Sequence, residues 1–179
     1  SNFNFSKIKI TGTGSYLPST IITNGDIAKT VKTSDEWIFE NLGIKERRIV
    51  DNELTSDLAT KAAKKAIEAA SLVPEDIDCI ILATSTPDRI APSTACIVKN
   101  KLNIKNNCPA FDIAAVCSGF LYGLHLASFQ IQSGIYGKIL VIGADTFSKI
   151  TDWARRDCVF FGDGAGAAII EKADGAACF

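Results

Sequence analysis

Three unbroken apolar runs predict the central strands of a buried sheet. They are CIILATST at residues 79–86, PAFDIAA at 109–115 and KILVIGAD at 138–145. Because none alternates between apolar and polar positions, we expect both faces of these strands to be covered, and the segments between them favour a parallel arrangement. The remaining predicted strands are 7–17, which runs into a glycine-containing turn, 46–50, and a strand pair or one kinked strand at 159–172. The pattern predicts an α/β fold with a parallel sheet buried on both faces.

Helical periodicity is clearest at residues 55–72, where an apolar stripe lies opposite a row of lysines. This helix should therefore have one solvated face. A short helix is predicted at 24–31, opened by Asn24. The sequence Thr33-Ser34-Asp35-Glu36 predicts a capping box that starts another helix, which continues to about Asn41 and stops at Gly43.

The segment CSGFLYGLHLASFQIQSG, from residue 117 onward, is apolar almost all the way round. A helix of this kind must be covered on every side, and the sheet covers only one. Gly119, Gly123 and Ala127 recur every fourth residue, which predicts a seam for close contact with another helix. The sequence contains no second helix of this character. We therefore expect the covering element to lie outside these 179 residues, in a missing domain or a partner chain.

Composition narrows the functional classes. The chain has 179 residues, 47% of them hydrophobic, with 19 Lys and Arg against 20 Asp and Glu. That is enough for one well-cored domain, and the even charge gives no reason to expect nucleic acid or membrane as a partner. With no secretory signal pattern, we expect a cytoplasmic protein. Ser1-Asn2 and the absence of Met suggest an added or processed start.

Six cysteines are present, and their spacing contains no CxxC pair, so we expect no metal site. Cys117 differs from the rest because it follows a buried strand at the first turn of a helix. Unpaired backbone N–H groups and the positive end of the helix dipole favour its nucleophilic thiolate form there. The others are expected to be small core residues. They are Cys79, Cys96, Cys108, Cys158 and Cys178.

The chain offers Cys117 no evident acid–base partner. Its only histidine, His125, lies eight residues along the same helix. That spacing is roughly 12 Å along the helix and about 80° around its axis, too far for a hydrogen bond to the sulfur. A cysteine hydrolase is therefore disfavoured, and a nucleophile without its partners again indicates that part of the site lies elsewhere.

Several motifs resemble those of the β-ketoacyl-acyl carrier protein synthase III family, within the thiolase superfamily. In order along the chain they are TSDEWI at 33–38, GIKERRI at 43–49, PAFDIAAVCSGF at 109–120, GAD at 143–145 and FGDGAGA at 161–167. Each is weak alone, but together they keep the family's order and spacing over essentially the whole chain.

This resemblance implies a thiolase-like α/β fold of two related halves, each with a mixed, mostly parallel five-stranded sheet, packed as five α-β-α-β-α layers. The helices of the nucleophile type then lie face to face in the middle. Residues 1–179 would form the N-terminal half that carries the cysteine, with the C-terminal half absent from this chain. The family also pairs through this half, so a homodimer is expected.

The resemblance also implies a chemistry. Cys117 would take an acyl group from acyl-coenzyme A and condense it with malonyl-acyl carrier protein, which initiates fatty acid synthesis. A His and an Asn from the second half would promote decarboxylation, and the backbone N–H of Cys117 would supply one oxyanion donor. No cofactor is implied, since acyl-coenzyme A is a substrate. Related members make other products by the same first step, so another condensing enzyme is one alternative. The alternative that is not an enzyme is a truncated, non-catalytic fragment that serves as a dimerisation scaffold.

For coenzyme A, the resemblance implies that Trp37 and Arg155 sandwich the adenine and that Thr33 lies near the nucleotide. Without it, Trp37 would be a half-buried anchor and Arg155 a solvated charge. Three positions depart from the common pattern: Asn41 replaces an Arg, Arg156 a small residue, and Ala91 a bulky Phe. Since the Phe closes the acyl pocket from the neighbouring subunit, Ala91 could admit a longer or branched starter.

FGDGAGA at 161–167 has a second interpretation as a phosphate-binding loop. Its glycine spacing does not match a dinucleotide fingerprint, and no Lys-Ser/Thr pair follows. Glycines that allow close backbone approach beside an active site are the favoured interpretation.

Overall fold

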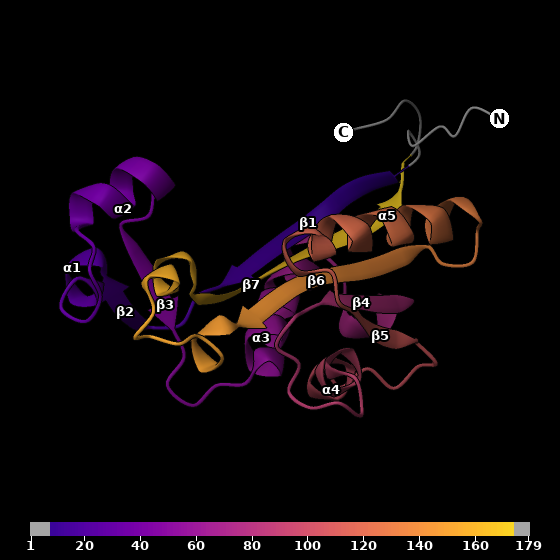
Figure 1. The fold of residues 1–179 in the computed structure, drawn as a ribbon. Helices are drawn as coiled ribbons and strands as arrows, with labels where there is room; N and C mark the ends of the chain where they lie inside the picture. Colours follow the sequence, from indigo (N-terminus) through magenta and orange to yellow (C-terminus); the bar gives the residue numbers. More distant parts are fainter. Residues whose placement is uncertain (1–7, 174–179) are drawn as a thin grey trace.

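The computed structural model describes residues 8–173, which form a three-layered body with a smaller lobe at one end (Figure 1). The central sheet has the strand order β1-β7-β6-β4-β5. Its strands are β1 (Ile8–Tyr16), β4 (Cys79–Ala83), β5 (Ala110–Ile113), β6 (Lys138–Thr146) and β7 (Asp163–Lys172). β4 pairs in parallel with β5 and β6, whereas β7 runs antiparallel to both β1 and β6. All strands but β7 therefore point the same way, which confirms the mixed, mostly parallel sheet.

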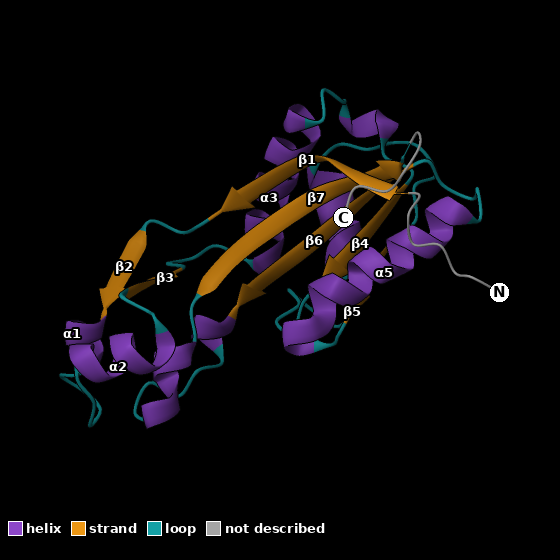
Figure 2. Ribbon diagram, turned by 90° about the horizontal axis from the view of Figure 1, so that it is seen from above, coloured by secondary structure: helices purple, strands orange, loops and turns teal. Residues whose placement is uncertain are grey.

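Helices cover both faces of the sheet (Figures 1 and 2). α3 (Thr55–Ala69) and α4 (Thr94–Lys101) lie on one face, and α5 (Gly119–Gln132) lies on the other. Alternate residues of β4 serve the two cores: Ile80 and Leu82 pack beneath α3 and α4, while Cys79 and Ile81 pack beneath α5. This arrangement explains why the strand is apolar without alternation.

The two glycines at the middle of β1 allow α3 to approach the backbone of the strand. A Cβ at Gly12 would lie 2.3 Å from the Ala66 carbonyl oxygen, and one at Gly14 would lie 2.2 Å from that of Ala62. The predicted glycine turn is wrong, because β1 continues through this segment with only a register shift between Ile10 and Gly12. The glycines are needed for close packing of a helix on a strand.

The small-residue seam of α5 faces the sheet of this same chain. Gly119, Gly123 and Ala127 are buried, and a Cβ at Gly123 would lie 2.9 Å from a Val141 methyl carbon. The predicted contact of this seam with another helix is therefore wrong. The opposite face of α5 is apolar and uncovered within the described residues. Its exposed side chains include Leu121, Tyr122, Leu126 and Phe129.

The smaller lobe holds a separate two-stranded sheet and two short helices. They are β2 (Thr20–Thr23), β3 (Glu46–Ile49), α1 (Asn24–Ile27) and α2 (Asp35–Leu42). Its core contains Ile38 and Val159, the latter from a 3₁₀ turn of the distant segment 156–160. The predicted caps are each wrong by one position: Thr23 caps α1, and Ser34 caps α2 by accepting a hydrogen bond from the Trp37 N–H. Gly43 ends α2 in the left-handed region, as predicted (φ 70°).

Short 3₁₀ turns complete the described elements. They are η1 (Pro74–Asp76), η2 (Val116–Ser118), η3 (Phe147–Lys149) and η4 (Arg156–Phe160). α4 was not predicted, because its eight residues separate apolar from polar positions only weakly, and its start depends on the Ser93 side chain accepting the Cys96 N–H. Cys178 and the Ser1-Asn2 start lie outside the described residues.

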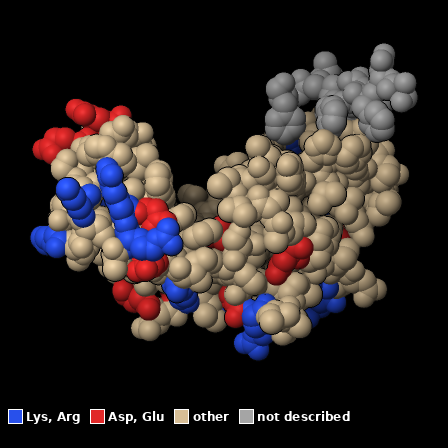
Figure 3. Space-filling view, viewed as in Figure 1, with Lys and Arg blue, Asp and Glu red and all other residues tan. Residues whose placement is uncertain are grey.

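Charged side chains are unevenly distributed on the face shown in Figure 3. The smaller lobe carries Lys, Arg, Asp and Glu atoms, whereas the surface around α5 is almost free of them. Among the residues described, no helix combines the length and the apolar character needed to cross a bilayer.

Candidate active site

Cys117 lies on a sharp turn between β5 and α5, and its side chain is exposed. The chain leaves the sheet at Ile113, passes through η2, and enters α5 at Gly119. The N–H groups of a first helical turn have no intrahelical partners, and Cys117 lies just before those of α5. The predicted strand–cysteine–helix arrangement is confirmed.

The turn itself is held in an unusual conformation. Val116 has a φ of 45°, in the left-handed region that β-branched residues rarely adopt. On the other side of Cys117, Gly119 is buried, and a Cβ there would lie 3.0 Å from that of Ala83 at the end of β4. The start of α5 is therefore pressed against the sheet edge, and this contact presents Cys117 outward.

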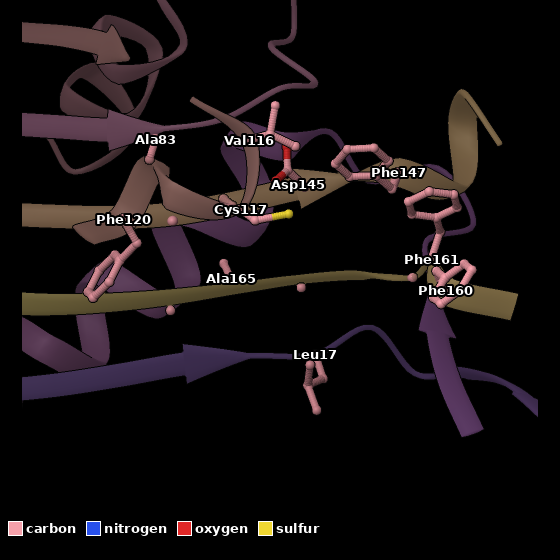
Figure 4. A pocket seen from close by; sticks show the side chains of 15 residues that line it. Leu17, Ala83, Val116, Cys117, Phe120, Asp145, Phe147, Phe160, Phe161 and Ala165 are labelled. Atoms are coloured by element: carbon pink, nitrogen blue, oxygen red, sulfur yellow. The ribbon is translucent and has the colours of Figure 1, made fainter. Parts of the chain in front are cut away.

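Cys117 opens into a hollow of about 510 Å³ at the carboxyl ends of the strands (Figure 4). We call this the Cys117 hollow. Its lining is mostly aromatic, small or glycine: Leu17, Ala83, Val116, Cys117, Phe120, Gly143, Ala144, Asp145, Phe147, Phe160, Phe161, Gly162, Gly164, Ala165 and Gly166. The FGDGAGA motif therefore lies beside Cys117, as the active-site interpretation expects, and it continues directly into β7 rather than into the helix that a phosphate loop would require.

The other described cysteines separate into two kinds. Cys79, Cys108 and Cys158 are buried. Burial raises the pKa of Cys79 to about 12 and that of Cys108 to about 11, so both remain neutral thiols. Cys96 is exposed on α4, and its expected place in the core is wrong. Among the described cysteines, only Cys117 lies in the hollow.

Asp145 is the one carboxylate that lines the Cys117 hollow, and sequence reasoning gave it no role. Its Oδ1 accepts hydrogen bonds from the Ser85 N–H at 2.8 Å and from the Thr84 and Thr86 hydroxyls at 3.1 and 3.0 Å. It thereby ties the loop after β4 to the end of β6. The available signal was the position of GAD at the carboxyl end of a predicted strand, where sites form in parallel sheets.

Comparisons with known proteins show which proteins this chain resembles. A family model described as 3-oxoacyl-[acyl-carrier-protein (ACP)] synthase III matches residues 111–179. A β-ketoacyl-[acyl-carrier-protein] synthase III of Neisseria meningitidis is 56% identical over 168 residues, covering 93% of this chain and 52% of that relative. A relative of the same name from Caldanaerobacter subterraneus is 57% identical, covering 92% and 50%.

The structural comparison gives the same result. The crystal structure of 3-oxoacyl-[acyl-carrier-protein] synthase III from Aquifex aeolicus superposes with a TM-score of 0.91 at 51% identity, covering 94% of this chain and 55% of that one. In sequence and fold this chain is therefore similar to one part of synthase III proteins. It spans about half the length of the curated relatives it matches. The thiolase-like fold expected from its motifs is thus confirmed.

The coenzyme A positions that the resemblance implies fall in and beside the smaller lobe. Trp37 on α2 has a guanidinium over its ring, but it belongs to Arg156, whose Cζ lies 4.4 Å from the ring centroid. Arg155 instead pairs with Asp157, with Nη2 to Oδ2 at 2.9 Å. The structure therefore brings Trp37 together with the neighbour of the predicted arginine.

The remaining predicted positions do not line the Cys117 hollow. The Thr33 hydroxyl does not cap α2, and its oxygen is buried without a hydrogen-bond partner. Ala91 is exposed on the loop between β4 and α4 and does not line the Cys117 hollow. Asn41 donates a hydrogen bond to the Trp37 carbonyl at 2.8 Å. The coenzyme A and acyl-pocket roles of these residues stay predictions.

His125 is exposed on the outer face of α5, with its ring 4.9 Å from that of Phe129. His125 is absent from the lining of the Cys117 hollow, in agreement with the prediction that it lies too far along α5 to contact Cys117. Within residues 8–173, no group of three or more His, Cys, Asp or Glu side chains is arranged to hold a metal ion.

Arg47 connects the two segments that meet at Trp37. Its buried guanidinium donates to Asn24 Oδ1 at 2.9 Å and to the Val159 carbonyl at 3.2 Å. Asn24 in turn donates to Asp35 Oδ1 at 2.8 Å, in the first turn of the helix that carries Trp37. Burial without a carboxylate partner lowers the pKa of Arg47. This arginine therefore joins α2 to η4, the turn that carries Arg156.

We expect Arg47→Met to displace Arg156 from Trp37. Loss of the guanidinium leaves the side chain of Asn24 and the Val159 carbonyl without their donor, which should cost about 2 kcal/mol of stability. Fluorescence measures this in a Trp153→Phe background, where Trp37 is the remaining tryptophan. The emission spectrum of Trp37 in the Arg47→Met variant should approach its spectrum in an Arg156→Ala variant of the same background. Arg48→Met is the matched control, since Arg48 bonds to Pro18 and Glu46 instead. Unchanged emission in a folded Arg47→Met protein would show that the connection does not position Arg156.

Proposed function

We propose that this protein is an acyltransferase that initiates fatty acid synthesis by loading an acyl group on Cys117 and condensing it with malonyl-acyl carrier protein. The observation that carries the proposal is the outward presentation of Cys117 on a strained strand-to-helix turn, within a hollow lined mostly by aromatic, small and glycine residues, while Cys79, Cys108 and Cys158 are buried. The names of the relatives support it.

The reaction follows from thiolate chemistry in two stages. The Cys117 thiolate attacks the thioester carbonyl of acyl-coenzyme A, and collapse of the tetrahedral intermediate expels the coenzyme A thiolate. Malonyl-acyl carrier protein then loses carbon dioxide to give an enolate. This enolate attacks the acyl-cysteine carbonyl, and the Cys117 thiolate leaves as 3-oxoacyl-acyl carrier protein forms. The backbone N–H of Cys117 would donate to the oxyanion.

Binding of the nucleotide end is proposed at Trp37, with Arg155 and Thr33 nearby. The exposed indole of Trp37 supports a site for a planar base, because an indole is an effective stacking partner. Arg156, whose Cζ lies 4.4 Å from the ring centroid, would have to move aside for a base on that face. Acylation is proposed to need no cofactor or metal, and the protein to act in the cytoplasm.

The rest of the site is proposed to come from a second, C-terminal half that carries His and Asn, with residues 1–179 as the N-terminal half. A homodimer would place Ala91 at a neighbouring acyl pocket. The uncovered apolar face of α5 supports a covering element of this kind, because a contiguous apolar surface of a soluble protein marks an interface.

Intact mass after incubation with acetyl-coenzyme A tests the loading step. One acetyl adduct is expected on the wild-type protein and none on Cys117→Ala. Cys96→Ala is the matched control, since Cys96 is also exposed but lies on α4, and it should retain the adduct. An adduct that persists in Cys117→Ala would contradict the proposal.

The condensation step is tested by adding malonyl-acyl carrier protein to the acetylated protein. Release of 3-oxoacyl-acyl carrier protein with regeneration of free Cys117 is expected. Acetylation with no condensation product would instead favour the scaffold reading, and a different product would favour another condensing enzyme of the superfamily. Comparing loading by acetyl- and longer acyl-coenzyme A tests Ala91, for which a strict acetyl preference would oppose a wide pocket.

A further inference from the structure

The Cys117 hollow shares a wall with a second, smaller hollow. The second hollow has a volume of about 180 Å³ and is lined by residues of the segment 147–157 together with Phe161. Phe147 and Phe161 line both spaces. Their rings stack with centroids 5.2 Å apart and planes 8° from parallel, and Phe160 lies edge-on to Phe161. Figure 4 shows the three rings grouped on one side of Cys117.

The backbone on both sides of Phe147 is fixed by hydrogen bonds from other strands and loops. The N–H of Thr146 donates to the Thr86 hydroxyl at 2.8 Å, and that of Ser148 donates to Asp163 Oδ1 at 2.8 Å. Asp163 also follows Phe161 by two residues, so one buried carboxylate anchors both sides of the stacked pair. The two rings are therefore held as a fixed partition between the hollows.

We propose that Phe147 is a specificity-determining residue that, with Phe161, limits the length of the acyl group accepted at Cys117. This inference rests on the proposed function. An aromatic wall next to the nucleophile provides apolar contact for a short acyl chain and blocks a longer one. On the far side of the wall, the second hollow provides further space beside Phe147, Ile150 and Phe161. A small side chain at position 147 joins the two spaces.

The test is the ratio of loading rates with octanoyl- and acetyl-coenzyme A, followed as acyl adducts on Cys117 in the full protein. Phe147→Ala is expected to raise this ratio by about tenfold or more, since a few methylene groups are discriminated by this much in an apolar pocket. Phe161→Ala removes the other ring and should act in the same direction. Phe39→Ala is the control, because Phe39 is exposed on α2 and lines neither hollow.

An unchanged ratio in folded Phe147→Ala and Phe161→Ala proteins would overturn the proposal. An equal fall in both rates would overturn it as well, because the wall would then face the part of coenzyme A that both substrates share. Phe147→Leu keeps a large apolar side chain, so it gives the same test at smaller amplitude if the alanine variants do not fold.

A second readout separates this proposal from the proposed function. Methyl and octyl methanethiosulfonates modify Cys117 without any acyl transfer, and peptide mapping distinguishes that adduct from one on Cys96. Phe147→Ala should raise the octyl-to-methyl rate ratio at Cys117. If this ratio rises while acyl-coenzyme A loads no wild-type protein, the wall limits the hollow but the acyltransferase proposal fails. If it does not rise, the wall proposal fails independently.

Discussion

Replacing Gly14 by alanine is expected to lower the free energy of unfolding by about 3 kcal/mol or more, the upper range for overpacking. The new Cβ would lie 2.2 Å from the Ala62 carbonyl oxygen and 2.6 Å from the Ala66 N, both backbone atoms of α3. Backbone of a helix cannot move aside as a flexible side chain can, so β1 and α3 must separate. Urea denaturation followed by circular dichroism measures the loss.

Gly166→Ala is the matched control, since an added Cβ there meets no atom within 4 Å. Gly166 lies in β7 directly opposite Ser15, one position along from Gly14. Its unfolding free energy should stay within about 0.5 kcal/mol of wild type. Equal stability of the two variants would show that the close approach of α3 to β1 is not tight in solution.

These glycines also show where sequence reasoning stops. The sequence shows that Gly12 and Gly14 have no side chain, but not why. The cause is the close approach of α3, a helix some fifty residues later, and the local pattern does not reveal this contact. Gly123 is a second example, because its spacing with Gly119 and Ala127 resembles a helix–helix seam, yet Val141 of the sheet fills that place. The continuous apolar strands were predictable because a strand buried on both faces has apolar residues at every position, and this signal lies within the strand's own sequence.

The candidate site divides in the same way. Cys117 could be predicted because its signal is local: a buried strand, a cysteine, a glycine and an apolar helix follow one another. The sequence could not predict which of the two adjacent arginines lies over Trp37. That choice depends on the course of the chain at η4, where Arg155 turns toward Asp157 and Arg156 toward α2. Asp145 was missed because its partners lie some sixty residues earlier.

Asp163→Ala is expected to lower the free energy of unfolding by roughly 3 kcal/mol, because charged hydrogen bonds to buried groups are lost together. The buried carboxylate accepts the Val50 N–H at 2.7 Å, the Ser148 N–H at 2.8 Å and the Ser148 hydroxyl at 2.5 Å. No other side chain of the described residues takes these bonds, so three donors lose their acceptor. Urea denaturation again gives the loss.

Asp157→Ala is the control for charge removal, since Asp157 is exposed and its pairing with Arg155 should contribute less than about 1 kcal/mol. Because Asp163 anchors Ser148, next to Phe147, its loss should also loosen the wall of the Cys117 hollow and raise the rate at which octyl methanethiosulfonate modifies Cys117. Asp163→Asn, which keeps one oxygen acceptor, should fall between wild type and alanine in both measurements. If stability falls but that rate does not change, the stacked rings keep the wall in place without the carboxylate. Asp163 would then stabilise the fold without fixing the position of Phe147.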